Sequence, residues 1–395
     1  MPAASLDTRS VLLICTLAVL AHFGLTGGRV AVALGALAQG SSSFTVGVMM
    51  ALFAVLPMLL SVHSGRWVDR IGVRRPMRVG AWLLLAGSAL PWIIQDTRVF
   101  FLSSCATGIG CMVFQIACQN LVGMRSAPDD RMLNFARLAL SMSVSGFGGP
   151  LLAGLAIDHL GHRWAFGLLA LCPMIALIVL QRQRHRFARG GSHAPAAAAR
   201  QQLGDLLADP MMRRVLLATV LLSGAWDLNS FMVPIYGASI GLSATTIGVI
   251  LSAFASATFV IRLLLPWIQR RLQPWTLLRG AMGMAGSVYL AYPFFAEAPM
   301  LIGLAFLLGL ALGSGQPSLL SLLHAYSPAG RMAEALGLRM SLINGGQFCL
   351  PLVFGAIGTV AGHGLPFWTM AALLLPGAVL TGRGIRQEAA RPPQR

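Results

Sequence analysis

The chain has 395 residues, of which 56% are apolar and only 10% are charged, and its mean hydropathy is +0.74. A soluble domain carries about 25% charged residues. The composition therefore excludes a soluble enzyme, a secreted disulfide scaffold and a disordered chain. All 29 basic residues are arginines, and they give a formal net charge of +17. Together these features indicate a polytopic membrane protein.

Twelve stretches are long and apolar enough to cross a bilayer as helices. In chain order they are 10–37, 44–64, 76–95, 98–123, 133–156 and 163–181, then 212–238, 244–265, 275–295, 299–323, 332–360 and 365–382. We expect an all-α membrane protein with twelve transmembrane helices in two pseudo-symmetric six-helix bundles. The N-terminal bundle is expected over residues 1–181, a cytoplasmic linker over 182–211, and the C-terminal bundle over 212–395.

The arginines predict the orientation of these helices in the membrane. Arg98 and Arg163, at the first residues of their spans, lie on one side of the membrane. Apart from four arginines within spans, the others cluster in the alternate segments and the central linker. Cytoplasmic segments of membrane proteins carry the excess of basic residues. We therefore expect a multi-pass protein of the bacterial inner membrane with both termini in the cytoplasm. The positive charge then faces anionic lipid, and we expect no nucleic-acid partner.

The two halves of the sequence also resemble each other at a spacing of about 200 residues. A set of glycines, phenylalanines and glutamines recurs in the same order in both halves, as the pairs Gly47 and Gly248, Phe53 and Phe254, Gly108 and Gly309, and Gln115 and Gln316. Six spans in each half give the two halves the same direction through the membrane. The pattern predicts an internal repeat.

The segment after the second predicted span carries a recognisable motif, which we expect to form a loop. It contains Gly65, Asp69, Arg70 and Gly72, followed by the basic pair Arg74 and Arg75. This G-x-x-x-D-R-x-G run resembles the loop 2–3 signature of the major facilitator superfamily. Together with the two sets of six spans and the basic linker, the resemblance covers essentially the whole chain. It implies a secondary transporter with that family's twelve-helix fold.

The resemblance also implies a role for the motif as a cytoplasmic gate. Asp69 is the only acid among the arginines of this segment. By analogy with the family, Asp69 engages the start of the eleventh span near residues 330–333, where helix amides favour an anion. This contact would hold the cytoplasmic side shut. An ordinary basic loop that only sets topology is the alternative.

A second motif lies in the fifth span. Ser145, Gly149, Pro150 and Gly154 resemble the family's antiporter motif, although Ser145 and Ala153 stand where that motif has glycines. Small residues beside a proline allow close helix packing and a bend. This favours export. The arginine that exporters of the family often carry early in the fourth span is absent, because Ser104 occupies that place.

Polar groups at membrane depth are costly and usually functional. Asp227 is the only acid deep within a predicted span, so it is our candidate for proton coupling. In the first span His22, Thr26 and Arg29 share one helix face. The repeat maps that face onto Ser223, Asp227 and Ser230. By family architecture the first and seventh helices face a central cavity, where Arg29 could pair with Asp227 or bind an anionic group.

Further polar residues within the spans are candidates to line the substrate cavity. With His22, Thr26 and Arg29 they form one set: Gln115, Gln119, Trp226, Asn229, Gln316, Asn344 and Gln347. Hydrogen bonding between helices explains any single one of these amides equally well. Arg137, Arg262 and Arg339 lie within a couple of turns of cytoplasmic helix ends, and we expect them to extend towards the interface or to close the inner gate.

The leading interpretation is a secondary active transporter that exports a small organic solute in exchange for protons. The alternatives are uptake of a small solute, for which Arg29 favours an anion, and a membrane sensor that binds a ligand without moving it. No phosphate-binding GxxxxGK[ST] loop and no clustered catalytic set occur in the sequence, so we expect neither an ATP-driven pump nor an enzyme. The expected partners are a small-molecule substrate, protons and the lipid bilayer. We expect a monomer without cofactor or metal.

Overall fold

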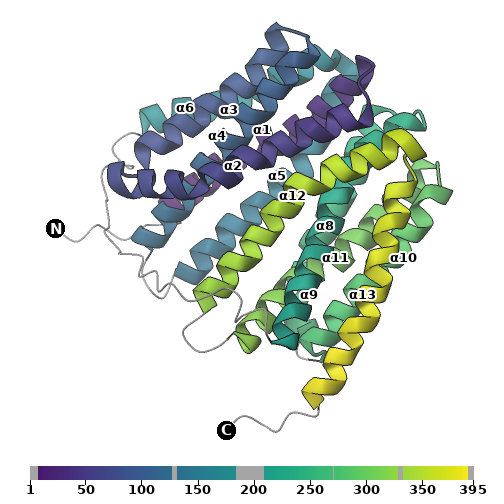
Figure 1. Cartoon of the computed structure of the whole chain (residues 1–395). Helices are drawn as coiled ribbons and strands as arrows, with labels where there is room; N and C mark the ends of the chain where they lie inside the picture. The colour runs from purple at the N-terminus through teal and green to yellow at the C-terminus, as the bar shows by residue number, and fades with distance from the viewer. Residues whose placement is uncertain (1–7, 127–130, 184–208, 270, 328–331, 390–395) are drawn as a thin grey trace. The chain divides into compact units, whose positions relative to one another are not determined.

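The computed structural model describes residues 8–126, 131–183, 209–269, 271–327 and 332–389; within these ranges some side chains, including that of Asp69, are not described. The secondary structure of these ranges is entirely helical (Figure 1). The first half contains α1 (Thr8–Ala38), α2 (Ser43–Ile71), α3 (Arg74–Ile93), α4 (Thr97–Arg125), α5 (Arg131–Leu160) and α6 (His162–Arg182). The second half contains α8 (Pro210–Ser239), α9 (Ala244–Gln269), α10 (Pro274–Ala291), the short 3-10 turn η1 (Tyr292–Phe294), α11 (Ala298–Tyr326), α12 (Met332–Ala361) and α13 (Leu365–Ala389).

All twelve predicted spans are confirmed as helices, and ten of them are long and apolar enough to cross a membrane by length and composition. The other two are α3 and α10, which occupy the same place in the two halves. Helix α3 begins with Arg74 and Arg75, and α10 has only 18 residues, among them Arg279. These charged residues lower the mean hydropathy of the two helices.

The boundary between α2 and α3 differs from our expectation. The motif from Gly65 onward was expected to form a loop, but α2 continues to Ile71 and α3 starts at Arg74. The turn therefore consists only of Gly72 and Val73. Gly72 has a φ of 78°, a backbone conformation that favours glycine, and its amide donates to the Val68 carbonyl at 2.9 Å. A helix can run through polar sequence where it leaves the bilayer, so hydropathy ended the span too early.

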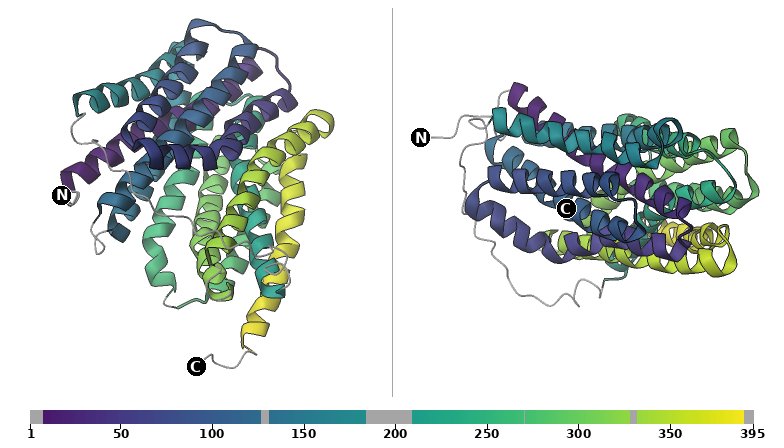
Figure 2. Two further views of the ribbon diagram at one scale, coloured as in Figure 1. Left: turned by 60° about the vertical axis from the view of Figure 1, so that its left-hand side comes forward. Right: turned by 90° about the horizontal axis from the view of Figure 1, so that it is seen from above.

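The chain divides into two compact units. Unit 1 comprises Met1–Ala197 and Gly241–Ser252, so it includes α1 to α6 and the first turns of α9. Unit 2 comprises Ala198–Ile240 and Ala253–Arg395. Within unit 1, α3 packs against α4 and α6, and α1 packs against α5 and α6; within unit 2, α10 packs against α11 and α13 (Figure 2). The domain boundaries expected at residues 181 and 212 stay a prediction.

The internal repeat is visible in the packing of each unit. In unit 1 a Cβ added to Gly108 of α4 would lie 2.5 Å from the carbonyl oxygen of Phe53 on α2. In unit 2 a Cβ added to Gly309 of α11 would collide in the same way with the carbonyl of Phe254 on α9. Both contacts need glycine because a backbone occupies the space of a side chain. In the sequence repeat Gly108 corresponds to Gly309 and Phe53 to Phe254. The two units therefore contain the same contact between helices.

Candidate functional site

In unit 1 the predicted polar face of α1 lies against α5. His22, Thr26 and Arg29 are all half-buried. The Nδ1 atom of His22 lies 2.6 Å from Oγ of Ser145, and the hydroxyl of Thr26 donates to the Ser145 carbonyl at 2.9 Å. The guanidinium of Arg29 stands 5.6 Å from the centre of the Phe53 ring, a cation–π distance. The structure thus brings this triad together on one face.

The small residues of the α5 motif explain how α1 comes so close. A Cβ on Gly149 would collide with the Thr26 hydroxyl and would lie 2.9 Å from the Gly27 amide nitrogen. Pro150 follows directly and lies within the helix. One turn later, a Cβ on Gly154 would lie 2.9 Å from the carbonyl carbon of Ala244 in the first turns of α9. Gly149 therefore allows the close approach of α1, and Gly154 allows that of the first turns of α9.

Asp227 lies on the accessible side of α8 in unit 2. Between residues 222 and 237 of α8 every residue is buried except three. These half-buried residues are Trp226, Asp227 and Ser230. These three share one helix face. The ring of Trp226 makes an edge-to-face contact with Phe254, at 4.8 Å between ring centres. Asp227 is also close enough to the Tyr289 hydroxyl of α10 to interact with it electrostatically.

Asn229 lies on a different face of α8 from Asp227. Its side chain is 1% exposed, and neither amide atom has a hydrogen-bond partner among the described residues. Its neighbour is Tyr289, whose hydroxyl donates to the Ala225 carbonyl of α8. Tyr289 belongs to an aromatic cluster with Tyr292 and Phe367. The structure thus places Asn229 in the core of unit 2, apart from the accessible face.

The remaining amide candidates lie on three helices. Gln316 of α11 and Asn344 and Gln347 of α12 are half-buried, as is Gln115 of α4, whereas Gln119 is exposed. One of these amides accepts a hydrogen bond from a cation: Nη2 of Arg339, on α12, donates to the Oε1 atom of Gln316 at 2.5 Å. This pair joins α11 to α12 within unit 2.

The gate motif lies at the junction of α2 and α3. Arg70 and Arg75 are exposed and Arg74 is half-buried. The side chain of Asp69 and the residues 328–331, near which we expected it to bind, lie outside the described residues. The predicted contact between them therefore stays a prediction.

The structure reveals one interaction that our sequence analysis missed. The carboxylate of Asp158, at the end of α5, accepts hydrogen bonds from the backbone amides of Ala244 at 3.0 Å and Thr245 at 2.7 Å. These are the first amides of α9, which have no partner within their own helix. Asp158 therefore caps a helix that begins 86 residues later in the chain. A possible sequence signal is its position one turn after Gly154, the residue that brings α5 next to α9.

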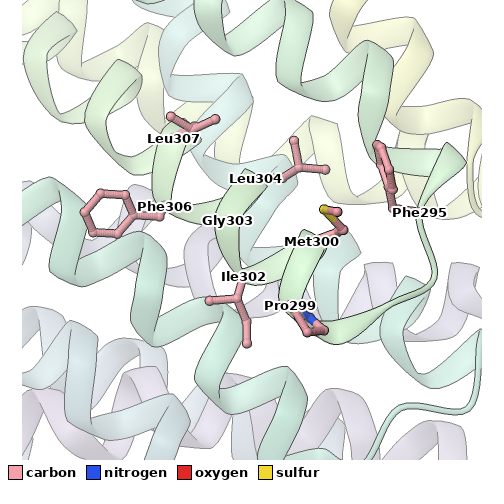
Figure 3. A pocket seen from close by; sticks show the side chains of 8 residues that line it. All are labelled: Phe295, Pro299, Met300, Ile302, Gly303, Leu304, Phe306 and Leu307. Atoms are coloured by element: carbon pink, nitrogen blue, oxygen red, sulfur yellow. The ribbon is translucent and has the colours of Figure 1, made fainter.

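A separate apolar recess of about 610 Å³ lies along the first half of α11 (Figure 3). Its lining side chains are apolar throughout, and include Phe295, Met300, Phe306 and Leu307. These four are at least 36% exposed. None of the predicted cavity residues lines this recess. Exposed apolar side chains on a transmembrane helix indicate contact with lipid rather than a substrate site.

These observations define a class: a polytopic helical membrane protein built as two repeats, with a polar helix face in each. Two overlapping segments, residues 12–298 and 215–394, match the family model of the Major Facilitator Superfamily. The matches cover most of the chain. The protein belongs to the major facilitator superfamily, a family of membrane transporters.

Solved structures of transporters share this fold. A peptide transporter POT in complex with sulfate superposes with a TM-score of 0.80 at 14% identity, over 98% of this chain and 97% of that one. The nucleoside transporter NupG gives a TM-score of 0.76 at 12% identity, over 94% and 99%. At such identities the similarity shows the fold alone.

One curated relative is more similar in sequence over a short stretch. A segment of 123 residues is 30% identical to the class D tetracycline resistance protein of Salmonella ordonez. The match covers 29% of this chain and 29% of that protein. The chain therefore matches less than a third of the length of that relative.

Proposed function

We propose that this transporter exports a small organic solute from the bacterial cytoplasm in exchange for protons. In this proposal it is a monomer of the inner membrane with both termini in the cytoplasm. The two six-helix halves alternate in exposing a central site to either side of the membrane. The driving force comes from a proton that binds and leaves Asp227.

The position of Asp227 is the observation that carries this proposal. It is the single acid deep within a span in the sequence, and it lies on the accessible face of α8 beside Trp226 and Ser230. An ionisable residue within a membrane-spanning helix is costly unless it has a function. A carboxylate that alternates between charged and neutral forms links proton binding to a conformational change.

Two observations favour export over uptake. The small residues of the α5 motif resemble the antiporter motif of the family, and Gly149 and Gly154 make close helix contacts in unit 1. In addition, part of the chain resembles a tetracycline resistance protein. A drug efflux substrate is the first class to screen on this ground.

Inside-out vesicles test both the direction and the coupling. A growth screen of deletion and overexpression strains, with tetracycline among the toxic compounds, first identifies a cargo. We expect vesicles with an acidified lumen to accumulate it, and the Asp227→Asn variant to lose all dependence on the pH gradient. Asp209→Asn, which removes an acid from the start of α8, is the matched control and should transport normally. Unchanged pH dependence in Asp227→Asn would exclude Asp227 as the coupling site.

Uptake of a small anionic solute is the second candidate. It is favoured by Arg29, a cation on the polar face of α1 that stacks near Phe53. Uptake predicts the opposite result, accumulation in right-side-out vesicles with an acidic exterior. A sensor would bind its ligand in liposomes without any flux.

A further inference from the structure

Arg339 is a buried cation that the transport mechanism described so far does not use. Its side chain is only 4% exposed, and it lies within the apolar span Leu338–Ala361 of α12. Within the described part of the chain, its Nη2 atom donates a hydrogen bond to the neutral amide of Gln316 on α11. Its Nε atom is buried and has no hydrogen-bond partner among the described residues.

A neutral amide does not compensate this charge. Burying a guanidinium without an opposite charge is unfavourable, and within the described part of the chain no carboxylate forms an ion pair with Arg339. Gln316 can orient the guanidinium, but it contributes only a dipole. Among the described residues nothing compensates the charge of Arg339, and an anion is the group that would do so.

The shape of the unsatisfied group indicates which anion fits. In arginine, Nε–H and one hydrogen of Nη2 point in the same direction along one edge of the planar group. A carboxylate binds such an edge with two parallel hydrogen bonds. Here Nε–H has no acceptor among the described residues. Nη2 carries two hydrogens, so it can donate one to Gln316 and the other to a carboxylate. This edge of the guanidinium can therefore donate two hydrogen bonds to one carboxylate.

We propose that Arg339, oriented by Gln316, binds a carboxylate group of the transported solute, so that the cargo is a small organic anion. This inference rests on the proposed transport function and names the class of its substrate. The site is closed in this conformation, as its low exposure shows. A transporter that works by alternating access needs such a closed stage. The binding geometry is available whether the cargo is exported or taken up.

Binding of a minimal probe to the purified full-length protein tests the site. Benzoate supplies the carboxylate, and benzamide is its neutral counterpart of similar shape. We expect the wild type to bind benzoate more tightly than benzamide in a titration followed by tryptophan fluorescence. Arg339→Gln should weaken benzoate binding about 10- to 100-fold, as expected for the loss of a charge-assisted pair, and leave benzamide binding unchanged.

Two further variants separate recognition from folding. Arg137→Gln is the matched control: Arg137 is half-buried on α5 of unit 1 and also donates to a neutral amide, that of Asn134 at 3.2 Å. It loses the same charge and should keep the preference for benzoate. Gln316→Ala retains the cation but removes its orienting partner, so it should weaken benzoate binding by a smaller factor. This variant also keeps the test valid if Arg339→Gln does not fold.

The proposal is overturned if the wild type does not prefer benzoate, or if Arg339→Gln retains the preference. Either result would leave the proposed proton-coupled transport intact, because that is tested separately by the loss of pH-driven flux in Asp227→Asn. Conversely, benzoate selectivity that depends on Arg339 would stand even if Asp227→Asn transported normally. The two proposals can therefore fail independently.

Discussion

Nδ1 of His22 and Oγ of Ser145 lie 2.6 Å apart and join α1 to α5. The bond explains why Ser145 departs from the glycine that the family motif has at this place. A glycine would allow the same close approach but would leave the imidazole without this partner. The Ser145 carbonyl also accepts the Thr26 hydroxyl, so that one residue of α5 holds two residues of the polar face of α1.

Removing the Ser145 hydroxyl should therefore loosen this face. We expect Ser145→Ala to lower the free energy of unfolding by about 1 to 2 kcal/mol, since it leaves the ring of His22 with one hydrogen bond fewer in a partly buried place. Thermal unfolding in detergent measures the change. Ser239→Ala is the control, because Ser239 bonds only to a carbonyl of its own helix, that of Tyr236. Equal melting temperatures for Ser145→Ala and wild type would contradict this prediction.

Gly149 allows the close approach itself. We expect Gly149→Ala to destabilise unit 1 by about 1 to 3 kcal/mol, because the new methyl group would overlap the Thr26 hydroxyl and force α1 and α5 apart. Gly345→Ala makes the same chemical change on α12, where a Cβ meets nothing within 4 Å. It should leave the melting temperature unchanged or raise it slightly. A similar loss in both variants would mean that flexibility, and not contact, makes glycine necessary at 149.

Much of this architecture was predictable because the bilayer restricts it. A helix that crosses the membrane must be apolar over about 20 residues, so the twelve helices could be located from the succession of apolar stretches, although α3 and α10 are less apolar than the other ten. The repeat was predictable too, since Gly108 and Gly309 keep the same spacing from Phe53 and Phe254. Hydropathy fails outside the bilayer, which is why the helical part of the gate motif up to Ile71 was expected to be a loop.

The candidate site was predictable only in part. Helical periodicity placed His22, Thr26 and Arg29 together. It did not show that Asn229, which we expected to line the cavity, is buried in the core of unit 2. It could not identify the partner of a side chain on another helix. Nothing in the local sequence of Asp158 indicates that its partners are the amides of Ala244 and Thr245.

The role of Asp158 as a cap can be measured directly. We expect Asp158→Asn to accelerate hydrogen–deuterium exchange in the first turn of α9, because the amide side chain has one acceptor oxygen and no charge for the helix N-terminus. The loss should correspond to about 1 kcal/mol. Asp209→Asn is the matched control: Asp209 caps α8 from within its own segment through the Met211 amide at 2.9 Å. Its effect should be confined to α8.

The gate motif makes a prediction about transport rather than stability. We expect Asp69→Asn to abolish transport while membrane insertion and expression stay normal, because the proposed contact with the start of α12 requires a negative charge. Flux in proteoliposomes measures the first effect and the yield of monodisperse protein the second. The Asp69→Glu variant keeps the charge and should retain part of the flux. Near-normal transport by Asp69→Asn would contradict the gate role.

Gly72 tests whether the two-residue turn between α2 and α3 depends on backbone conformation. A Cβ at this position would meet no atom within 4 Å, so any cost of Gly72→Ala comes from the positive φ of 78° alone. With a ψ of 170° the backbone lies in a region that is almost confined to glycine, and such a conformation costs a residue with a side chain about 1 to 3 kcal/mol. We therefore expect a lower melting temperature for Gly72→Ala. Gly280→Ala, at an equally open position inside α10, should instead be neutral or stabilising, because alanine favours a helix. If Gly72→Ala melted like the wild type, the short turn would not need glycine, and the motif would keep Gly72 for some reason other than the geometry of the turn.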